Sequence, residues 1–190
     1  MPPRLTRERF LSSSELGRIM DAARDRRHKH QPRDHAMIAL LVGTGMRPRE
    51  VLRVVRGDLK LSGDRPRVAV LRPETVTGVA AANELPLHPA VAAIVAKHCN
   101  QMDPGARLFP ITSRQAERLF RYYCRTAGLA GRRTMFAVRH GIAWRLYERH
   151  RDLRVLQAVL GHRWLKTLHG YTHTAHTITL AEVAAAALEA

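Results

Sequence analysis

The sequence of 190 residues predicts a mainly helical α+β domain that contains a small three-stranded antiparallel β-sheet. Two observations support this fold class. Apolar residues recur at helical spacing in most segments, whereas three short stretches, 58–61, 67–71 and 83–87, show the alternation and flanking turn residues of strands. Hydrophobic residues make up 45% of the chain, which is enough for one buried core, and the two cysteines are expected to be reduced thiols.

Three helices are expected before the sheet. The first begins at an N-cap offered by the run 12–15, which reads SSSE, and its basic end, 24–30, stops before Pro32. The second runs from about Arg33 to a glycine turn at 43–45, and a short third helix covers 49–55. After the sheet, the apolar spacing predicts helices over 88–99, 112–127, 134–150, 153–160, around 165, and over the Ala-rich stretch 178–190.

Three parts are expected along the chain: a basic N-terminal arm over 1–10, one folded domain over 11–177, and a C-terminal helix over 178–190. That last helix can pack on its own domain or against a neighbouring copy, and the sequence leaves both open. The chain contains no apolar run of about 18 residues and its first residues lack a signal-peptide pattern, so a cytoplasmic location is expected.

Charge narrows the classes of partner. Lys and Arg number 32 against 16 acidic residues, which gives a formal net charge of +16. Arginine dominates, and its planar fork matches the oxygens of phosphate. A basic domain of this size is expected to bind a polyanion and release its counterions. Nucleic acid is the first candidate. An anionic membrane surface is the second, but it is disfavoured because the basic first helix lacks an aromatic-rich opposite side, so neither a membrane partner nor a small-molecule substrate is expected.

Four short motifs carry candidate chemistry. In Thr44–Glu50, which reads TGMRPRE, Arg47 follows a glycine turn at a helix start, where a guanidinium and backbone N–H groups make an anion site. The others are the RH pair at 139–140, the LGH at 160–162 and the YTH at 171–173. Each motif alone is also explained by a solvated arginine, a structural histidine or a tyrosine anchor.

Taken together and in this order, the four motifs resemble the tyrosine recombinase (phage integrase) family along nearly the whole chain. The resemblance implies the fold of the family's catalytic domain, with the small sheet between the first two motifs. It also implies that Arg47 and Arg139 clamp a scissile DNA phosphate, that His162 contacts it, and that Tyr171 is the nucleophile. The layout is similar to that of short recombinases that invert a fimbrial promoter.

The resemblance implies a site-specific recombinase or integrase, a DNA strand transferase. Attack by the tyrosine gives a 3′-phosphotyrosyl bond and a free 5′-hydroxyl, so the bond energy is kept and neither ATP, a metal nor another cofactor is expected. Two fixed guanidiniums bind the more negative transition state better than the ground state. Family members act as tetramers on paired sites, so double-stranded DNA and further copies of the chain are the expected partners.

Two positions depart from the family pattern. The loop between the second and third strands lacks the lysine that protonates the leaving 5′-oxygen, and Arg72, the nearest basic residue, does not readily give up a proton. Phe136 stands where the family has a histidine, and His140 is a candidate supporting residue. Because loss of a general acid or base costs about 10² to 10⁴ in rate, the alternative is a weakened or inactive DNA-binding relative acting as a regulator or accessory subunit.

Further arginines are expected to contact backbone phosphate, which positions a duplex without reading its sequence. They are Arg121, Arg125, Arg132 and Arg133. A metal-binding protein is a third class, disfavoured because no cysteine or carboxylate completes a ligand set. Its candidate ligands form two groups, His169, His173 and His176, and His28, His30 and His35.

Overall fold

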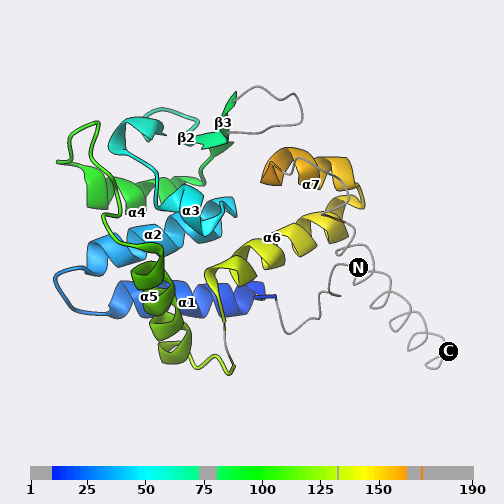
Figure 1. The fold of residues 1–190 in the computed structure, drawn as a ribbon, viewed down its shortest axis with the longest axis horizontal. Helices are drawn as coiled ribbons and strands as arrows, with labels where there is room; N and C mark the ends of the chain where they lie inside the picture. The colour runs from blue at the N-terminus through cyan, green and yellow to red at the C-terminus, as the bar shows by residue number, and fades with distance from the viewer. Residues whose placement is uncertain (1–9, 73–80, 132, 162–167, 169–190) are drawn as a thin grey trace.

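The computed structural model describes residues 10–72, 81–131, 133–161 and 168 (Figure 1). This part of the chain is mostly helical and has one three-stranded antiparallel sheet, so the predicted fold class is confirmed. Its elements are α1 Ser13–Asp25, α2 Gln31–Thr44, α3 Pro48–Val51, the 3₁₀ turn η2 Arg56–Asp58, β1 Leu59–Lys60, β2 Arg67–Arg72, β3 Ala81–Pro86, α4 Pro89–Cys99, α5 Ser113–Thr126, α6 Met135–His150 and α7 Leu153–Leu160.

The sheet has the order β1-β2-β3, and both pairs of strands are antiparallel. Val68 lies opposite Leu59 on one side and Leu85 on the other, and all three side chains are buried against the helices. The three predicted strands are therefore present, although β1 is two residues shorter than expected and β3 begins at Ala81. This sheet separates α3 from α4 in the chain.

Three helix boundaries differ from the sequence prediction. The first helix ends at Asp25, and the basic stretch that follows is a connection rather than a helix end, because Arg26 is already extended. Pro32 opens α2 instead of ending α1, since the first helical turn needs no N–H from proline. The third helix stops at Val51, and Val55 bridges to Arg107. The helices expected around 165 and over 178–190, and the arm up to residue 9, lie outside the described residues.

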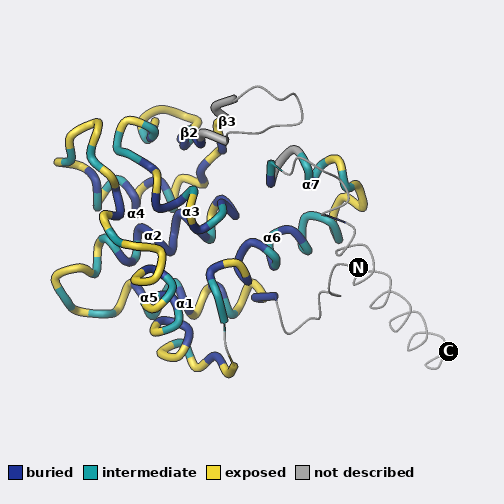
Figure 2. The backbone as a smooth tube through the Cα atoms, viewed as in Figure 1, coloured by how far each residue is buried: buried dark blue, intermediate teal, exposed yellow. Residues whose placement is uncertain are grey.

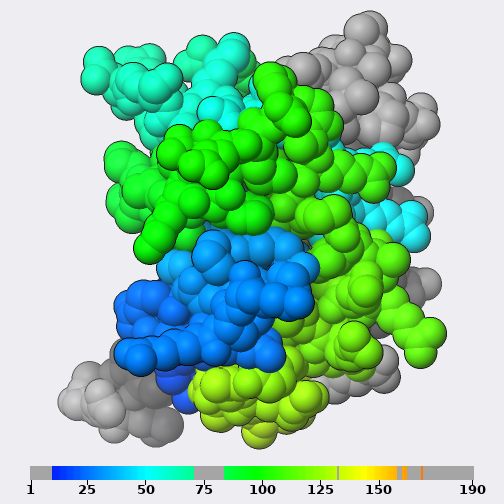
Figure 3. Space-filling model, turned by 90° about the vertical axis from the view of Figure 1, so that its left-hand side faces the viewer, coloured from blue at the N-terminus to red at the C-terminus, as the bar shows by residue number. Residues whose placement is uncertain are grey.

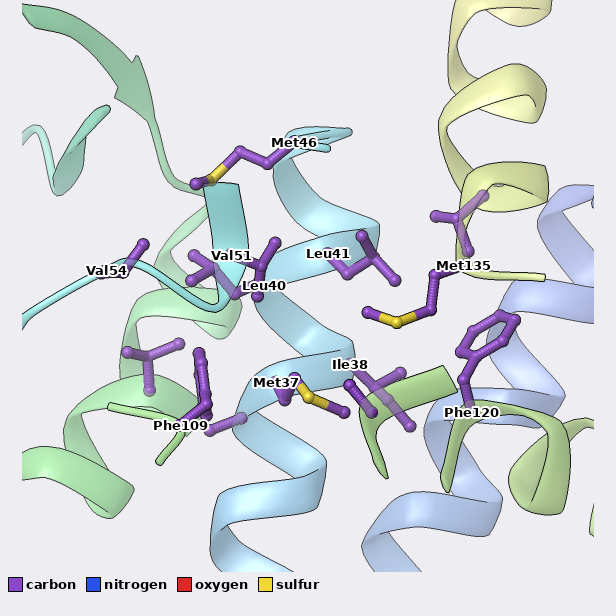
Figure 4. Packing of buried hydrophobic residues seen from close by; sticks show 14 of the residues in the cluster. Met37, Ile38, Leu40, Leu41, Met46, Val51, Val54, Phe109, Phe120 and Met135 are labelled. Carbon is purple, nitrogen blue, oxygen red and sulfur yellow. The ribbon is translucent and has the colours of Figure 1, made fainter. Parts of the chain in front are cut away.

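The core is built around α2, which packs against α1, α4 and α6. Its apolar side chains are buried almost all round, and this is the pattern of a central helix rather than an amphipathic surface helix. Met37, Ile38 and Leu41 lie among side chains from the later helices in Figure 4, including Phe120 and Met135. The tube in Figure 2 shows α2 as mostly buried. Because α2 is fixed in the core, the residues at its C-terminal end are fixed as well.

A second, smaller core lies between α6 and α7 and includes Leu156, Leu160 and Leu168. Phe10 joins it by stacking on Trp144, with ring centroids 5.9 Å apart. Leu11, the residue after Phe10, crosses α6 closely. A Cβ added to Gly141 would collide with the backbone carbonyl of Leu11. The helix α7 packs on α6, and this second core lies at their contact.

A buried carboxylate joins the start of α2 to α5. Asp34 is fully buried and accepts hydrogen bonds from Arg33, at 2.7 Å, and from the hydroxyl of Tyr123, at 3.0 Å. The Nε2 atom of His28 lies 3.3 Å from the same carboxylate. Burial raises the pKa of the Tyr123 hydroxyl to about 12, and the neighbouring negative charge of Asp34 adds to the rise.

Replacing Tyr123 by phenylalanine is expected to lower the free energy of unfolding by about 1–3 kcal/mol, because a buried carboxylate loses a donor. Urea unfolding measures this. The raised pKa also predicts that the parent loses stability as pH climbs from 10.0 towards 12, because the unfolded chain releases the phenolic proton first, and that the variant lacks this loss. Tyr122→Phe, on the exposed neighbouring tyrosine, is the control. Equal losses in both variants would contradict the role of the Asp34 bond.

Candidate active site

Arg47 lies in the sharp connection between α2 and α3. Gly45 ends α2 in the left-handed conformation, with φ of 65°, and Pro48 begins α3, so the chain passes from one helix to the next within three residues. The carboxylate of Glu50 accepts hydrogen bonds from both the backbone N–H and the Nη1 of Arg47, each at 2.7 Å. The side chain of Arg47 is 35% exposed. One edge of this guanidinium is therefore held in place while the group still reaches solvent.

Arg139 projects from the first half of α6 and is only 3% exposed. Its Nη1 donates to the carbonyl of Gly45 at 2.7 Å, and its Nη2 donates to the carbonyl of Leu160 at 2.6 Å. These acceptors lie at the C-terminal ends of α2 and α7, where carbonyls lack partners inside the helix and the helix dipole is negative. The two helix ends thus stabilise a buried positive charge.

The two arginines meet at the end of α7. The Nη2 of Arg47 donates to the carbonyl of Gly161 at 3.3 Å, next to the Leu160 carbonyl that binds Arg139. Figure 1 shows the C-terminal end of α7 on the side of α3. Gly161 ends α7 with φ of 63°, a conformation that costs an L side chain energy. Two guanidiniums from distant parts of the chain therefore donate to the carbonyls of adjacent residues, Leu160 and Gly161. His162 is the next residue in sequence.

The other predicted catalytic residues are placed less completely. His162 and Tyr171 lie outside the described residues, as does the side chain of Arg72. His140 is partly exposed, and its ring lies 6.5 Å from that of Phe136. Phe136 is 48% exposed at the start of α6. An exposed aromatic ring therefore stands about one helical turn before Arg139.

The arginines expected to contact phosphate differ in their surroundings. Arg125 is exposed on α5, whereas Arg121 is half-buried and its Nε donates to the carbonyl of Glu117 at 3.4 Å. Arg133 is mostly buried, with 18% of its side chain exposed, and lies 3.5 Å from a carboxylate oxygen of Glu15. Arg132 lies outside the described residues. Of the three that the structure describes, Arg125 is the one that lies on an open surface.

Sequence reasoning missed two further arginines on α5. Arg114 and Arg118 are exposed, and their spacing from Arg121 and Arg125 places all four on one side of the helix. The signal was present as a helical repeat of arginine over Ser113–Thr126. Glu50 closes the TGMRPRE motif, but no role was predicted for its carboxylate, which holds Arg47. The carbonyls that bind the guanidiniums had no sequence signal, since any residue carries one.

The described residues contain no group of three or more His, Cys, Asp or Glu side chains suited to hold a metal ion, and this covers the set at 28, 30 and 35. The other candidate set, at 169, 173 and 176, lies outside the described part. Both cysteines are buried and free. In the same part of the chain, no helix has the length and apolar character needed to cross a bilayer.

Comparison with known sequences defines the class of protein. The model of the phage integrase family matches residues 9–177, so this chain belongs to that family. A tyrosine recombinase XerC from Chlamydia muridarum is 31% identical over 149 residues, which are 74% of this chain and 46% of the relative. A tyrosine recombinase XerD from Neisseria meningitidis serogroup A is 26% identical over 186 residues, which are 92% and 62% of the two chains. The chain thus spans about half the length of such relatives.

Solved structures agree on the fold. The XerH recombinase in a pre-cleavage complex with its difH substrate matches 86% of this chain and 50% of its own, with a TM-score of 0.74 and 22% identity. The catalytic domain of bacteriophage HP1 integrase matches 92% of both chains, with a TM-score of 0.63 and 17% identity. The fold is therefore that of a tyrosine recombinase catalytic domain, and the family predicted from the four motifs is confirmed.

The role of Gly161 in fixing the C-terminal end of α7 can be tested without DNA. Gly161→Ala is expected to loosen α7, because an L residue at positive φ costs about 1–2 kcal/mol and relief of that strain moves the carbonyls that bind both arginines. Hydrogen exchange should then increase in α7 and around Arg47. Gly161→Asn should restore protection in part, since asparagine tolerates this conformation.

Gly128→Ala is the matched control. Gly128 has φ of 70° just after α5, and its backbone N–H donates to the carbonyl of Arg125 rather than to the arginine pair, Arg47 and Arg139. It should cost similar stability without affecting α7. If both alanine variants left exchange in α7 unchanged, the end of this helix would not depend on Gly161.

Proposed function

We propose that this chain is the DNA-cleaving domain of a site-specific recombinase that cuts and rejoins duplex DNA through a phosphotyrosyl bond to Tyr171. The observation that carries the proposal is the meeting of Arg47 and Arg139 on neighbouring carbonyls at the end of α7. Membership of the phage integrase family supplies the reaction type. The net charge of +16 supports a polyanionic substrate.

In the proposed reaction, the phenolic oxygen of Tyr171 attacks the scissile phosphorus and the bond to the 5′-oxygen breaks. The phenol gives up its proton as it attacks, and the leaving 5′-oxygen takes up one proton in exchange. The phosphate remains on the 3′-oxygen of the cut strand and is now esterified to the tyrosine. Attack by a 5′-hydroxyl of another strand reverses these steps and completes the exchange. Arg47 and Arg139 bind the non-bridging oxygens, whose negative charge grows in the transition state.

The rigidity of the arginine pair favours this role. Arg139 is buried and bound to two helix ends, and Arg47 is held by Glu50, so neither guanidinium needs to reorganise as charge develops. His162 directly follows Gly161 in the chain, and we assign it the third contact to the phosphate. Arg72 is the candidate to stabilise the leaving oxygen, and His140 is a candidate supporting residue.

The duplex and further copies of the chain complete the proposed assembly. Arg114, Arg118 and Arg125 form an exposed basic face on α5, suited to contact backbone phosphates along a groove. Exchange between two duplexes needs four strand cuts, so we assign the active form as a tetramer on paired sites. Residues 1–10 serve as a basic arm, 11–177 as the catalytic domain, and 178–190 as a helix that packs in cis or on a neighbour.

One observation favours a second candidate function. The family's histidine position is an exposed phenylalanine, Phe136, which cannot accept a proton, and the loop 73–80 contains no lysine. A chain that kept the basic surface but lost proton transfer would act as a DNA-binding regulator or accessory subunit. The two functions differ in a single product, the covalent adduct between protein and DNA.

The adduct can be sought without knowing the target site. A library of random duplexes with a nick near one strand's centre is incubated with the full chain, and DNA that stays attached under denaturing conditions is sequenced. We expect a recurrent site and an adduct that Tyr171→Phe abolishes. Arg139→Lys should slow adduct formation by about 10² to 10³, the effect of losing one fixed donor to a developing oxyanion.

Arg145→Lys is the matched control, because Arg145 lies on the same helix, is half-buried, and donates to the carbonyl of Leu11 away from the arginine pair. It should change the adduct rate little. DNA binding with no adduct from any library member would establish the regulator and overturn the recombinase.

Restoring the family's histidine should speed the reaction. Phe136→His places an imidazole one turn from Arg139, and a positioned general base contributes about 10² to 10⁴ in rate. The rate gain should disappear as pH falls below about 6.5, where imidazole becomes protonated. Single-turnover adduct formation measures both effects. Phe136→Leu serves as the comparison, and an equal gain with leucine would show that proton transfer was not the missing step.

A further inference from the structure

An exposed tyrosine on α5 lies among arginines from two elements. Tyr122 is 37% exposed, and the guanidinium carbon of Arg26, from the connection between α1 and α2, lies 4.2 Å from its ring centroid. This is close enough for a cation–π interaction. Arg118 and Arg125 are exposed on α5 about one turn before and after the tyrosine. The guanidinium of Arg26 thus lies over an exposed ring that other arginines border.

The connection between α1 and α2 adds further positive charge. Arg27 and Lys29 follow Arg26 and are both exposed. Figure 3 shows this connection, in blue, beside the yellow-green residues of α5 on one face of the molecule. We call the surface the Tyr122 patch and define it by six residues, Arg26, Arg27, Lys29, Arg118, Tyr122 and Arg125.

The aspartates near the patch form ion pairs with arginines outside it. Asp21 and Asp25 both pair with Arg24, at 2.9 Å and 2.8 Å. Asp34 is fully buried and pairs with Arg33 at 2.7 Å. Among the ion pairs of the described residues, none involves the four exposed cations of the patch, which are Arg27, Lys29, Arg118 and Arg125.

The patch is separate from the arginine pair. It borders the start of α2, whereas Arg47 follows the end of that helix, and a helix of 14 residues is about 21 Å long. Like charges gathered on one surface repel and destabilise the folded chain unless a partner neutralises them. The Nη1 of Arg26 donates to the hydroxyl of Tyr123, and a guanidinium over an aromatic ring can still offer other N–H groups to phosphate oxygens.

We propose that the Tyr122 patch, which shares Arg118 and Arg125 with the basic face of α5, extends the DNA-binding surface onto the connection between α1 and α2 and holds backbone phosphates of the duplex away from the site of cleavage. This inference rests on the proposed function, because it assumes that DNA is the substrate. The patch contributes affinity and not chemistry. It carries no nucleophile, and its contacts to phosphate do not depend on base sequence.

The test measures how salt weakens binding. The dissociation constant of the full chain for a duplex of unrelated sequence is determined from low to moderate salt, and the slope of log affinity against log salt counts the neutralised phosphates at about 0.9 each. The double variant Arg27→Ala with Lys29→Ala should reduce the magnitude of this slope by about 2. Adding Arg26→Ala should reduce it by about 1 more.

Arg24→Ala is the matched control. It removes one positive charge from the same region, but that charge is already paired with two aspartates, so the slope should not change. At saturating DNA, the patch variants should form the covalent adduct at the parent's rate, because they act far from the arginine pair. The double variant leaves Arg26 and its bond to Tyr123 intact, which guards against a loss of folding.

The outcomes separate this inference from the proposed function. A parent that binds DNA and a double variant with the same salt slope would overturn the patch and leave the recombinase standing. An equal change with Arg24→Ala would also overturn it, since the effect would be one of net charge. A parent that does not bind DNA at all would overturn both. If the double variant lost binding to phosphatidylserine vesicles that the parent binds, while its DNA binding stayed unchanged, the patch would be a membrane contact and the DNA proposal would be overturned.

Discussion

A buried cation, the guanidinium of Arg139, is the constraint on which the rest of the site depends. Taking such a charge out of water costs several kcal/mol unless the protein supplies well-placed partners. Here the partners include the last carbonyls of two helices, at Gly45 and Leu160. The ends of α2 and α7 must therefore both lie beside α6. Any change that moves one of these ends exposes the guanidinium to solvent or leaves it buried with fewer hydrogen-bond acceptors.

This constraint couples the two cores of the molecule. The main core fixes α2 and hence Gly45 and Arg47, whereas the smaller core between α6 and α7 fixes Leu160. The arginine pair bridges them, because Arg139 binds both helix ends and Arg47 binds Gly161. The geometry of the arginine pair thus arises from how the two cores meet.

Much of the fold follows from local sequence signals. Ser12 and Glu15 form the capping box that begins α1, and the apolar alternation located the three strands. The signal failed at the end of α1, because charged residues after Asp25 suit a helix as well as a loop. It failed at Pro32 because proline both ends one helix and opens another, and only packing decides which.

The site was predictable to a different degree. The order of the four motifs predicted the family, and the structure brings Arg47 and Arg139 to one place. The acceptors that hold them are backbone carbonyls, which no residue type signals. Sequence also cannot separate Arg133, which is near Glu15 and mostly buried, from Arg125, which is exposed, because both are arginines in a basic stretch.

The structure of the Tyr171→Phe chain bound to a duplex that the parent cleaves is the most direct measurement of the arginine pair. We expect one phosphate to lie with its non-bridging oxygens within about 3 Å of the guanidinium nitrogens of both Arg47 and Arg139, the distance of a charge-assisted hydrogen bond. A duplex whose phosphates touch only one of these arginines, or that lies on a face away from the end of α7, would contradict the shared phosphate site.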